Sequence, residues 1–477
     1  MQAKQTIRQN IAWLLLANLV SKPLWFLFLL LSARILGPEE FGKYMLPISF
    51  MSVSNGIFEG GIDIHSVRTL ASDASQFPRF FFHTTVIKIG STLLAGAGAY
   101  LLSLVVPSLA PNRTLLVIAI VYCAAFVTMT HFRSVIRAFE ILRYEAWSIF
   151  FEKTFVLVLC GFALVFIPTA IGYGAFFSAA YLIASGLTLW IIYNKIGIPT
   201  PPWNTRYAFT DVIKPALPFA MMNVFIILYV RSGTLLLAIM THSDVQIGYF
   251  NAGYRLVEAF ILFPSMIIAP LYPALVRKAN ESEEISRFAS EALRIILVIA
   301  CVISVPIFLL RNELTLLLYG KQYEAAASTI GILGLVMIPI GMNWVVGTLV
   351  AVTGKQSKAN LYILFVTIGN IAMLVALIPS FGTEGAAFAT LATECAITLT
   401  NWSLVKKYIN WFHVREILIK TTIAILGATV AAFFTSPFSV YVRLSAVVVT
   451  LVGCFYFLRQ ITIDALRKAF QEHPATS

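Results

Sequence analysis

Charged side chains occur inside long apolar stretches of this sequence, where charge is rare. Burying a charge in hydrocarbon is costly, so such residues usually face a polar cavity or an oppositely charged partner. The basic members are Lys22, Lys88, Lys153, Arg231 and Arg255, and the acidic members are Glu59, Asp63, Glu152, Glu258 and Glu394. Because the two signs balance, two interpretations stay open: ion pairs that stabilise the fold, and a site for a charged ligand.

The basic residues suit an anionic ligand. Lys22 lies near the middle of its apolar stretch, about 18 Å along a helix from either end, where its ammonium cannot easily reach the membrane surface. Arg231 has no acidic residue within two helical turns of its own segment, and a planar guanidinium binds phosphate oxygens well. Arg231 therefore needs either a partner from another helix or an anionic ligand, and the candidate cations for such a ligand are Lys22, Lys88, Arg231 and Arg255.

The acidic candidates for ion coupling or for charge pairing are Glu59, Asp63, Glu258 and Glu394. Glu59 and Asp63 are four residues apart, so on a helix they share one face and repel each other unless a cation or a proton relieves them. One interpretation is a coupling site for H⁺ or Na⁺, and the other is a structural pair of Glu59 with Lys22. Arg255 and Glu258 are three residues apart and can neutralise each other.

Other polar residues favour simpler roles. Glu152 and Lys153 are adjacent and do not face each other on a helix, so we expect them to snorkel toward the cytoplasmic end of their span. We expect His65, His83 and His131, near span ends, to be solvated. The five cysteines show no metal-ligand spacing, and motifs such as G-x-S-x-G and H-E-x-x-H are absent. The sequence therefore predicts no catalytic residue, no metal site and no cofactor other than a coupling ion.

The elements that carry these residues are long apolar segments. Of 477 residues, 59% are hydrophobic and 12% are charged, whereas soluble proteins average about 45–50% and about 25%. A helix crosses the hydrocarbon core with about 20 apolar residues. About fourteen segments qualify, at 10–33, 44–67, 80–106, 114–137, 146–168, 170–193, 215–240, 249–276, 288–310, 325–350, 358–380, 384–405, 416–436 and 440–460. This pattern predicts an all-α polytopic membrane protein with about 14 transmembrane helices.

The distribution of Lys and Arg predicts the orientation. The chain carries 34 Lys and Arg against 22 Asp and Glu, a net charge of +12. With the N-terminus in the cytoplasm, most basic residues fall in cytoplasmic segments, and the outer loops contain only Arg34, Lys43, Arg113, Arg311, Lys321 and Arg443. Basic loops stay in the cytoplasm, so we predict a plasma (inner) membrane protein with both termini inside. The positive excess then reflects topology and contact with anionic lipids, and no nucleic-acid partner is needed.

A faint internal repeat divides the predicted spans. Phe41-Gly-Lys-Tyr44 opens the second span and Ile247-Gly-Tyr-Phe250 opens the eighth, 206 positions later; a chance match is the alternative. Six spans in each half would make parallel repeats, related by an axis along the membrane normal, with a substrate cavity at their interface. We predict six-helix lobes at 1–200 and 201–410, followed by two additional helices and a cytoplasmic tail at 411–477.

Four sequence blocks carry a resemblance to a known family. They are Arg34-Ile-Leu-Gly-Pro-Glu-Glu-Phe-Gly-Lys-Tyr44, Gly248-Tyr-Phe-Asn-Ala-Gly-Tyr-Arg255, Leu318-Tyr-Gly-Lys-Gln-Tyr-Glu-Ala325 and Gly382-Thr-Glu-Gly-Ala-Ala387. With these blocks, nearly the whole chain resembles the polysaccharide transporter or O-antigen flippase (Wzx-type) branch of the multidrug/oligosaccharidyl-lipid/polysaccharide (MOP) exporter superfamily. The resemblance implies a transporter, not an enzyme, that moves a polyprenyl-diphosphate-linked oligosaccharide to the outer leaflet by alternating access.

The resemblance also implies partners and site residues. Cations in the early spans of each lobe hold the diphosphate in that family, and Lys22, Arg231 and Arg255 occupy comparable segments. The implied partners are the lipid-linked oligosaccharide, membrane lipids and a glycan polymerase or ligase of the same pathway. One departure from the family is that the acids inside the spans balance the cations. Three alternatives remain, a cation-coupled multidrug exporter of the same superfamily, a membrane glycosyltransferase or polymerase, and a non-transporting scaffold.

Overall fold

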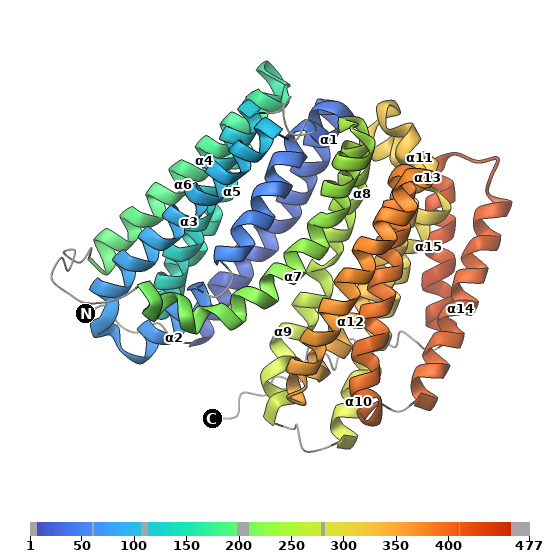
Figure 1. Cartoon of the computed structure of the whole chain (residues 1–477). Coiled ribbons are helices and arrows are strands. Elements are labelled where there is room, and N and C mark those ends of the chain that lie inside the picture. The colour runs from blue at the N-terminus through green and yellow to red at the C-terminus, as the bar shows by residue number, and fades with distance from the viewer. Residues whose placement is uncertain are drawn as a thin grey trace. The chain divides into compact units, whose positions relative to one another are not determined.

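The structure, a computed structural model, describes residues 7–59, 62–105, 113–197, 209–277, 282–409 and 411–458. These segments are helical apart from short connections (Figure 1). Among the described residues, nine helices are long and apolar enough to cross a membrane. The predicted all-α polytopic membrane fold is confirmed.

The chain forms two compact units, Met1–Asn251 and Ala252–Ser477. The first contains α1 (Ile7–Glu59), α2 (Ile62–Ser72), η1 (Ala74–Gln76), α3 (Phe77–Val105), α4 (Arg113–Ala138), α5 (Leu142–Phe166), α6 (Ala170–Lys195), α7 (Phe209–Thr241) and the first half of α8 (Asp244–Phe260). The second contains the rest of α8, then α9 (Leu262–Arg277), α10 (Ser282–Leu309), α11 (Arg311–Tyr319), η3 (Lys321–Ala326), α12 (Ala327–Val352), α13 (Gln356–Val405), η4 (Lys406–Tyr408), α14 (Trp411–Phe434) and α15 (Val440–Phe457).

Two glycines divide the two longest helices into pairs of spans. Gly37 in α1 has φ 78° and ψ 168°, and Gly382 in α13 has φ 53° and ψ −127°. Glycine adopts a positive φ without the strain that a Cβ would bring, so each position allows a sharp break between two helical segments. With these two breaks, every span predicted from the sequence has a helical counterpart.

Two features differ from the sequence prediction. The predicted span 249–276 is broken at Ile261 into α8 and α9, because Pro264 has no N–H to donate to the carbonyl of Phe260. The predicted outer loop after Arg311 contains the short helix α11, in which Leu314 is buried and Leu316 is exposed. A helix this short falls below the twenty-residue criterion for a span, so a search for spans misses it.

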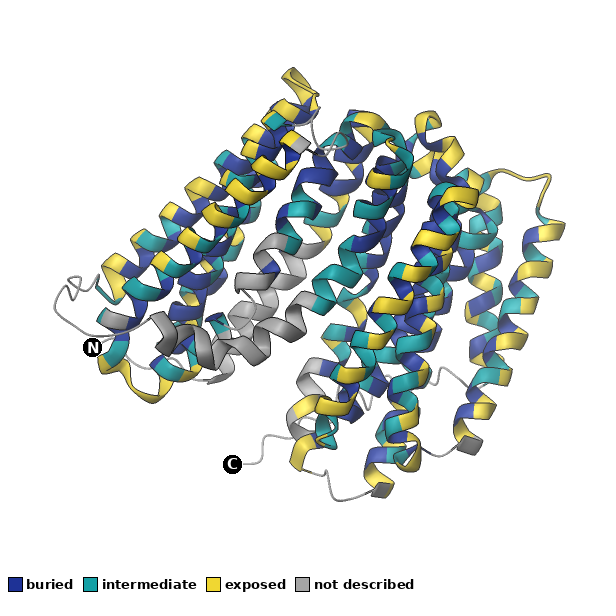
Figure 2. Ribbon diagram, viewed as in Figure 1, coloured by how far each residue is buried: buried dark blue, intermediate teal, exposed yellow. Residues whose placement is uncertain are grey.

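Each unit buries its own apolar core and leaves other apolar side chains outside (Figure 2). In the first unit, α2, α3, α4 and α6 meet around Phe80, Val135 and Ile192. In the second unit, α10, α12, α13 and α14 meet around a core that includes Leu297 and Val405. Many large apolar side chains face outward, as lipid-facing residues do.

Candidate functional site

An acidic side chain in the first unit lies between two basic groups. Lys88 of α3 donates from Nζ to Oδ1 of Asp63 in α2, at 2.5 Å. On α4, Nδ1 of His131 lies 3.7 Å from the same oxygen, and its Nε2 lies 2.9 Å from the hydroxyl of Thr84. Lys88 is 1% exposed and His131 is fully buried. The cation that neutralises Asp63 among the described residues is therefore Lys88.

The burial of His131 corrects a sequence prediction. Its ring packs near Phe81 and Phe132, with centroids 5.9 Å and 6.1 Å away, and it is not solvated. Although His131 is close to the end of its span in sequence, the packing of α3 against α4 excludes solvent from its side chain. Its position beside Asp63 makes it part of the candidate site, which the sequence did not predict.

A second buried carboxylate, Glu152 of α5, lies between two cations. Its Oε2 lies 2.8 Å from Nη2 of Arg133 in α4, and its Oε1 lies 2.6 Å from Nζ of Lys153. The hydroxyl of Tyr181 in α6 also donates to Oε1, at 2.9 Å. Glu152 is 3% exposed. Because two cations share one carboxylate, this cluster carries a net positive charge.

The expectation that Glu152 and Lys153 snorkel is therefore wrong. Adjacent residues leave a helix in different directions, but the long Lys153 side chain curls back to the neighbouring carboxylate, and its Nζ lies 4.5 Å from the ring centroid of Trp25 in α1. Sequence reasoning also missed Arg133, which donates from Nε to Ser148, at 2.9 Å. A usable signal was the spacing of Ser148 and Glu152, four residues apart, which places two polar groups on one buried face of α5.

In the second unit, the structure confirms the expected pair on α8. Nη1 of Arg255 contacts Oε2 of Glu258, one turn away. Glu394 is buried in the second half of α13. On the preceding residue, the Thr393 hydroxyl accepts a hydrogen bond of 2.8 Å from Nδ2 of Asn370 in the first half of the same helix. This part of α13 therefore has a polar interior.

The remaining predicted site residues lie in α1 and α7. Arg231 is partly buried in α7. Lys22 and Glu59 belong to α1, but their side chains lie outside the described residues. The structure thus brings together Lys88 with Asp63 and Arg255 with Glu258. The sequence had placed Lys88 among the substrate contacts, whereas its ammonium already has a buried partner.

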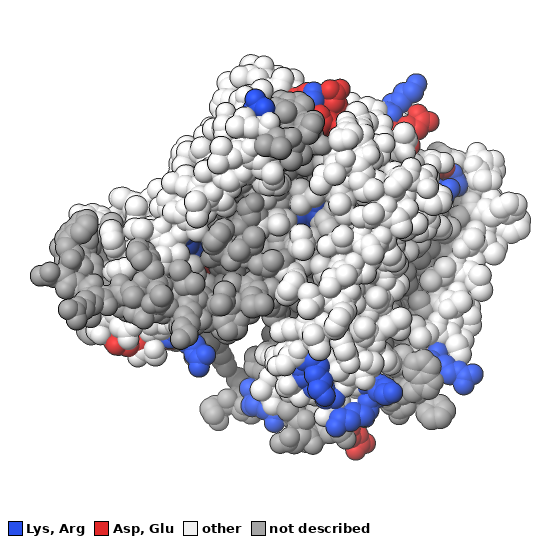
Figure 3. All heavy atoms as spheres, in the orientation of Figure 1, with Lys and Arg blue, Asp and Glu red and all other residues white. Residues whose placement is uncertain are grey.

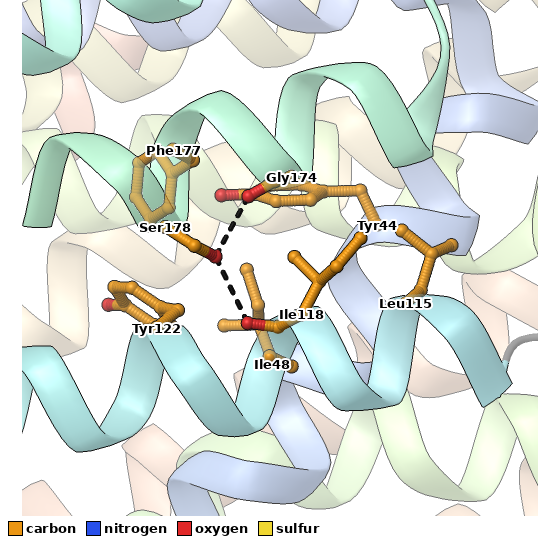
Figure 4. A pocket seen from close by; sticks show the side chains of 9 residues that line it. Tyr44, Ile48, Leu115, Ile118, Tyr122, Gly174, Phe177 and Ser178 are labelled. Atoms are coloured by element: carbon orange, nitrogen blue, oxygen red, sulfur yellow. Dashed lines mark hydrogen bonds between the residues drawn. The ribbon is translucent and has the colours of Figure 1, made fainter. Parts of the chain in front are cut away.

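A cavity in the first unit is too small to be the substrate site. Its volume is about 10 Å³, and its lining comes from α1, α4 and α6, including Tyr44, Tyr122 and Phe177 (Figure 4). Ser178 donates at its edge to the carbonyls of Gly174 and Ile118. A space of about 10–15 Å³ accommodates one water molecule, so this cavity is a gap in aromatic packing.

Comparisons with known proteins identify the same architecture. A family model described as "Polysaccharide biosynthesis protein" matches residues 7–278. The structure is similar to "Lipid II flippase MurJ, inward closed conformation", with a TM-score of 0.73 and 15% sequence identity over 94% of this chain and 99% of that chain. No curated protein sequence matches this chain.

Solved multidrug transporters have a similar fold. An inward-facing MATE family transporter of the MOP superfamily matches with a TM-score of 0.62 and 12% identity, over 80% of this chain and 93% of that chain. A MATE structure in complex with MaD3S matches with a TM-score of 0.51 and 13% identity, over 84% and 96% of the two chains. At these identities, the likeness shows a shared fold.

Proposed function

This chain belongs to the polysaccharide biosynthesis protein family, whose model matches residues 7–278, and from that premise we propose that it is a flippase for lipid-linked oligosaccharides. The substrate is a polyprenyl-diphosphate-linked repeat unit of an O-antigen or exopolysaccharide, moved to the outer leaflet of the plasma membrane. The observation that carries this proposal is the fold shared with a lipid II flippase over 94% of the chain. The termini lie in the cytoplasm, and a glycan polymerase or ligase uses the product.

In the proposed mechanism, the diphosphate and sugars cross through a polar interior by alternating access while the polyprenyl tail stays in lipid. Arg231 and Lys22 contact the diphosphate, because cations held at mid-span depth replace the water that phosphate oxygens lose. Arg255 contributes with its other N–H donors, while Nη1 stays with Glu258. Lys88 keeps its buried partner Asp63, because breaking such a pair leaves a carboxylate without a counter-charge.

The arrangement around Asp63 favours a proton over Na⁺ as the coupling ion. The ammonium of Lys88 lies 2.5 Å from the Asp63 carboxylate, so a sodium ion there would sit beside a like charge in a medium of low dielectric constant. His131 lies 3.7 Å from the same carboxylate, so in the proposal a proton on its ring would form an ion pair with Asp63. No further cofactor enters the proposal.

Three acids on the helices argue against export of cationic drugs. Such a substrate requires a carboxylate that it can pair with, but Asp63, Glu152 and Glu258 each already contact a Lys or Arg. A glycosyltransferase or polymerase is disfavoured, because the solved proteins with a similar fold are a lipid II flippase and a multidrug resistance transporter. A non-transporting scaffold would not need charges paired within the spans.

The decisive experiment deletes the gene and follows the lipid-linked glycan. We expect surface glycan to disappear and the oligosaccharide to accumulate on the inner leaflet, protected in intact spheroplasts from a lectin that detects it after lysis. Restoring the gene should reverse both effects without changing drug sensitivity. Normal surface glycan together with increased drug sensitivity would instead identify an exporter.

A further inference from the structure

The two ends of α13 bring four lysines together at one surface of the second unit. Lys355 and Lys358 lie where the helix begins, and Lys406 and Lys407 directly follow its end at Val405. The ends meet because the break at Gly382 reverses the chain, and Nζ of Lys355 donates to the carbonyl of Leu404. Residues about fifty positions apart in the sequence thus form one lysine cluster, comprising Lys355, Lys358, Lys406 and Lys407.

An aromatic ring joins the two halves of the lysine cluster. The Tyr408 ring centroid lies 4.7 Å from Nζ of Lys407 and 5.3 Å from Nζ of Lys355. Both distances are within the range of cation–π attraction, so the ring holds two ammonium groups near each other. Lys358, Lys406 and Lys407 are exposed and can therefore meet an external ligand.

The lysine cluster is mounted on a rigid base. Val405 and Ile409, which flank the exposed lysines, are buried in the same core as Ala359 near the start of α13. That core also includes Ile285 of α10 and Val350 of α12. Because the backbone beneath the lysines is packed, ligand binding has to order only their side chains.

Acidic partners are absent from this surface within the part of the chain that the structure describes. On neighbouring helices, two cations have acidic partners: Arg287 of α10 pairs with Glu291, and Lys420 of α14 pairs with Glu416. No such ion pair within 4.0 Å reaches the lysine cluster among the described residues. The sequence also places no acid between 325 and 383 or between 395 and 415. Figure 3 shows Lys and Arg at the lower end of the view, with some Asp or Glu atoms among them, near the start of α10.

We propose that the lysine cluster and Tyr408 bind the phosphate of an anionic phospholipid headgroup. The cluster lies where both apolar segments of α13 end, which is the depth at which headgroups meet a spanning helix. Tyr and Trp favour this interfacial level, and juxtamembrane Lys and Arg attract anionic lipids. A bound phosphate would neutralise four lysines that have no ion pair among the described residues, and it would tie the two ends of α13 together.

The test measures thermal unfolding of the full-length protein in neutral detergent while dioleoylphosphatidylglycerol or dioleoylphosphatidylcholine is added. The test variants are Lys358→Gln/Lys406→Gln/Lys407→Gln and Lys406→Gln/Lys407→Gln. The control, Arg287→Gln/Lys420→Gln, removes charge from residues whose acidic partners are exposed, and Lys406→Gln/Lys407→Gln is the test variant with the same change in charge. We expect phosphatidylglycerol to raise Tm in the wild type and the control, and at least half of that shift to be lost in each test variant. Added NaCl should weaken the shift, and phosphatidylcholine should produce none.

Three results would overturn the proposal: an unchanged shift in either test variant, no shift in the wild type, or an equal shift with inorganic phosphate alone. The last result would identify a free anion rather than a lipid as the ligand. If the triple variant does not fold, Lys406→Gln/Lys407→Gln, which changes two exposed side chains, tests the proposal alone with the same expectations. Because no glycan is involved, failure of the flippase proposal would leave this result unaffected.

Discussion

Gly42 and Gly248 lie at a crossing where two helices touch through their backbones. A Cβ placed on Gly42 would lie 1.8 Å from the carbonyl oxygen of Asp244, and one on Gly248 would lie 1.9 Å from that of Pro38. The contact is reciprocal, because Pro38 and Gly42 of α1 stand 206 positions before Asp244 and Gly248 of α8. Surfaces related by a two-fold axis make reciprocal contacts, and the internal repeat at this spacing stays a prediction.

A methyl group at this crossing should force the two helices apart. We expect Gly42→Ala or Gly248→Ala to destabilise the protein by about 1–3 kcal/mol, the usual cost of overpacking, and to reduce glycan export. Thermal unfolding and surface glycan measure the two effects. Gly90→Ala is the matched control, because a Cβ on Gly90 meets nothing within 4 Å. Equal behaviour of the three variants would show that the crossing relaxes freely.

The pair of Asp63 and Lys88 should respond more strongly to single than to double substitution. Asp63→Asn leaves the buried Lys88 ammonium without its partner, and Lys88→Met leaves the Asp63 carboxylate without its counter-charge. Breaking a buried pair costs about 3–5 kcal/mol. We expect each single variant to lose abundance in the membrane and Asp63→Asn/Lys88→Met to regain most of it. If the proposed coupling is correct, the double variant should still export poorly. Full export by the double variant would show that the pair is only structural.

Glu152 should contribute more to the stability of the protein than the neighbouring Lys153. Glu152→Gln leaves two unneutralised cations inside the first unit, and we expect a loss of about 3–5 kcal/mol in stability. Lys153→Met leaves a neutral pair of Glu152 and Arg133, so its cost should be much smaller. The thermal unfolding temperatures of the two purified variants test this order. The reverse order would mean that Lys153 neutralises an acid other than Glu152.

Glu40 links the start of the second half of α1 to the start of α6. Its Oε2 accepts a 2.6 Å hydrogen bond from the N–H of Ala170, and its Oε1 lies 2.8 Å from Nζ of Lys43. Burial raises the pKa of Glu40, but these two partners outweigh it and hold the pKa below its ordinary value of 4.5. A lowered carboxylate pKa stabilises the folded state above pH 4.5, and this stabilisation is lost as the pH falls through the lowered value.

Replacing Glu40 should therefore cost stability in a pH-dependent way. We expect Glu40→Ala to cost about 1–3 kcal/mol at pH 7, because the buried N–H of Ala170 loses its acceptor, and the difference from wild type to shrink in acid. Glu39→Ala removes a more exposed partner of the same Lys43, so it should cost only about 0–1 kcal/mol. Thermal unfolding between pH 7 and acid measures both. A pH-independent loss in Glu40→Ala would show that its charge contributes nothing.

The sequence predicted the spans because their signal is local. Among the described residues, twenty-residue apolar runs coincide with helices, and α1 and α13 break at glycines within the loops that the sequence predicts. Partners in the site were less predictable, because they depend on contacts between helices. The i, i+3 pair of Arg255 and Glu258 could be predicted from their spacing. The contact of Lys88 with Asp63 instead joins residues on two helices, 25 positions apart in the sequence. No feature of the sequence around Asp63 distinguished Lys88 from Lys22 as its partner.

Arg231 and Lys22 provide the most direct test of the substrate site. We expect Arg231→Ala and Lys22→Ala each to abolish surface glycan while membrane abundance stays unchanged, because in the proposed mechanism each substitution removes a contact to the diphosphate. Arg231→Lys should restore only part of the export, since an ammonium lacks the paired donors of a guanidinium. Arg287→Ala, an exposed cation on α10, controls for the loss of one positive charge. Normal export by both alanine variants would remove both residues from the substrate site and leave the Arg255–Glu258 pair as the remaining cationic candidate.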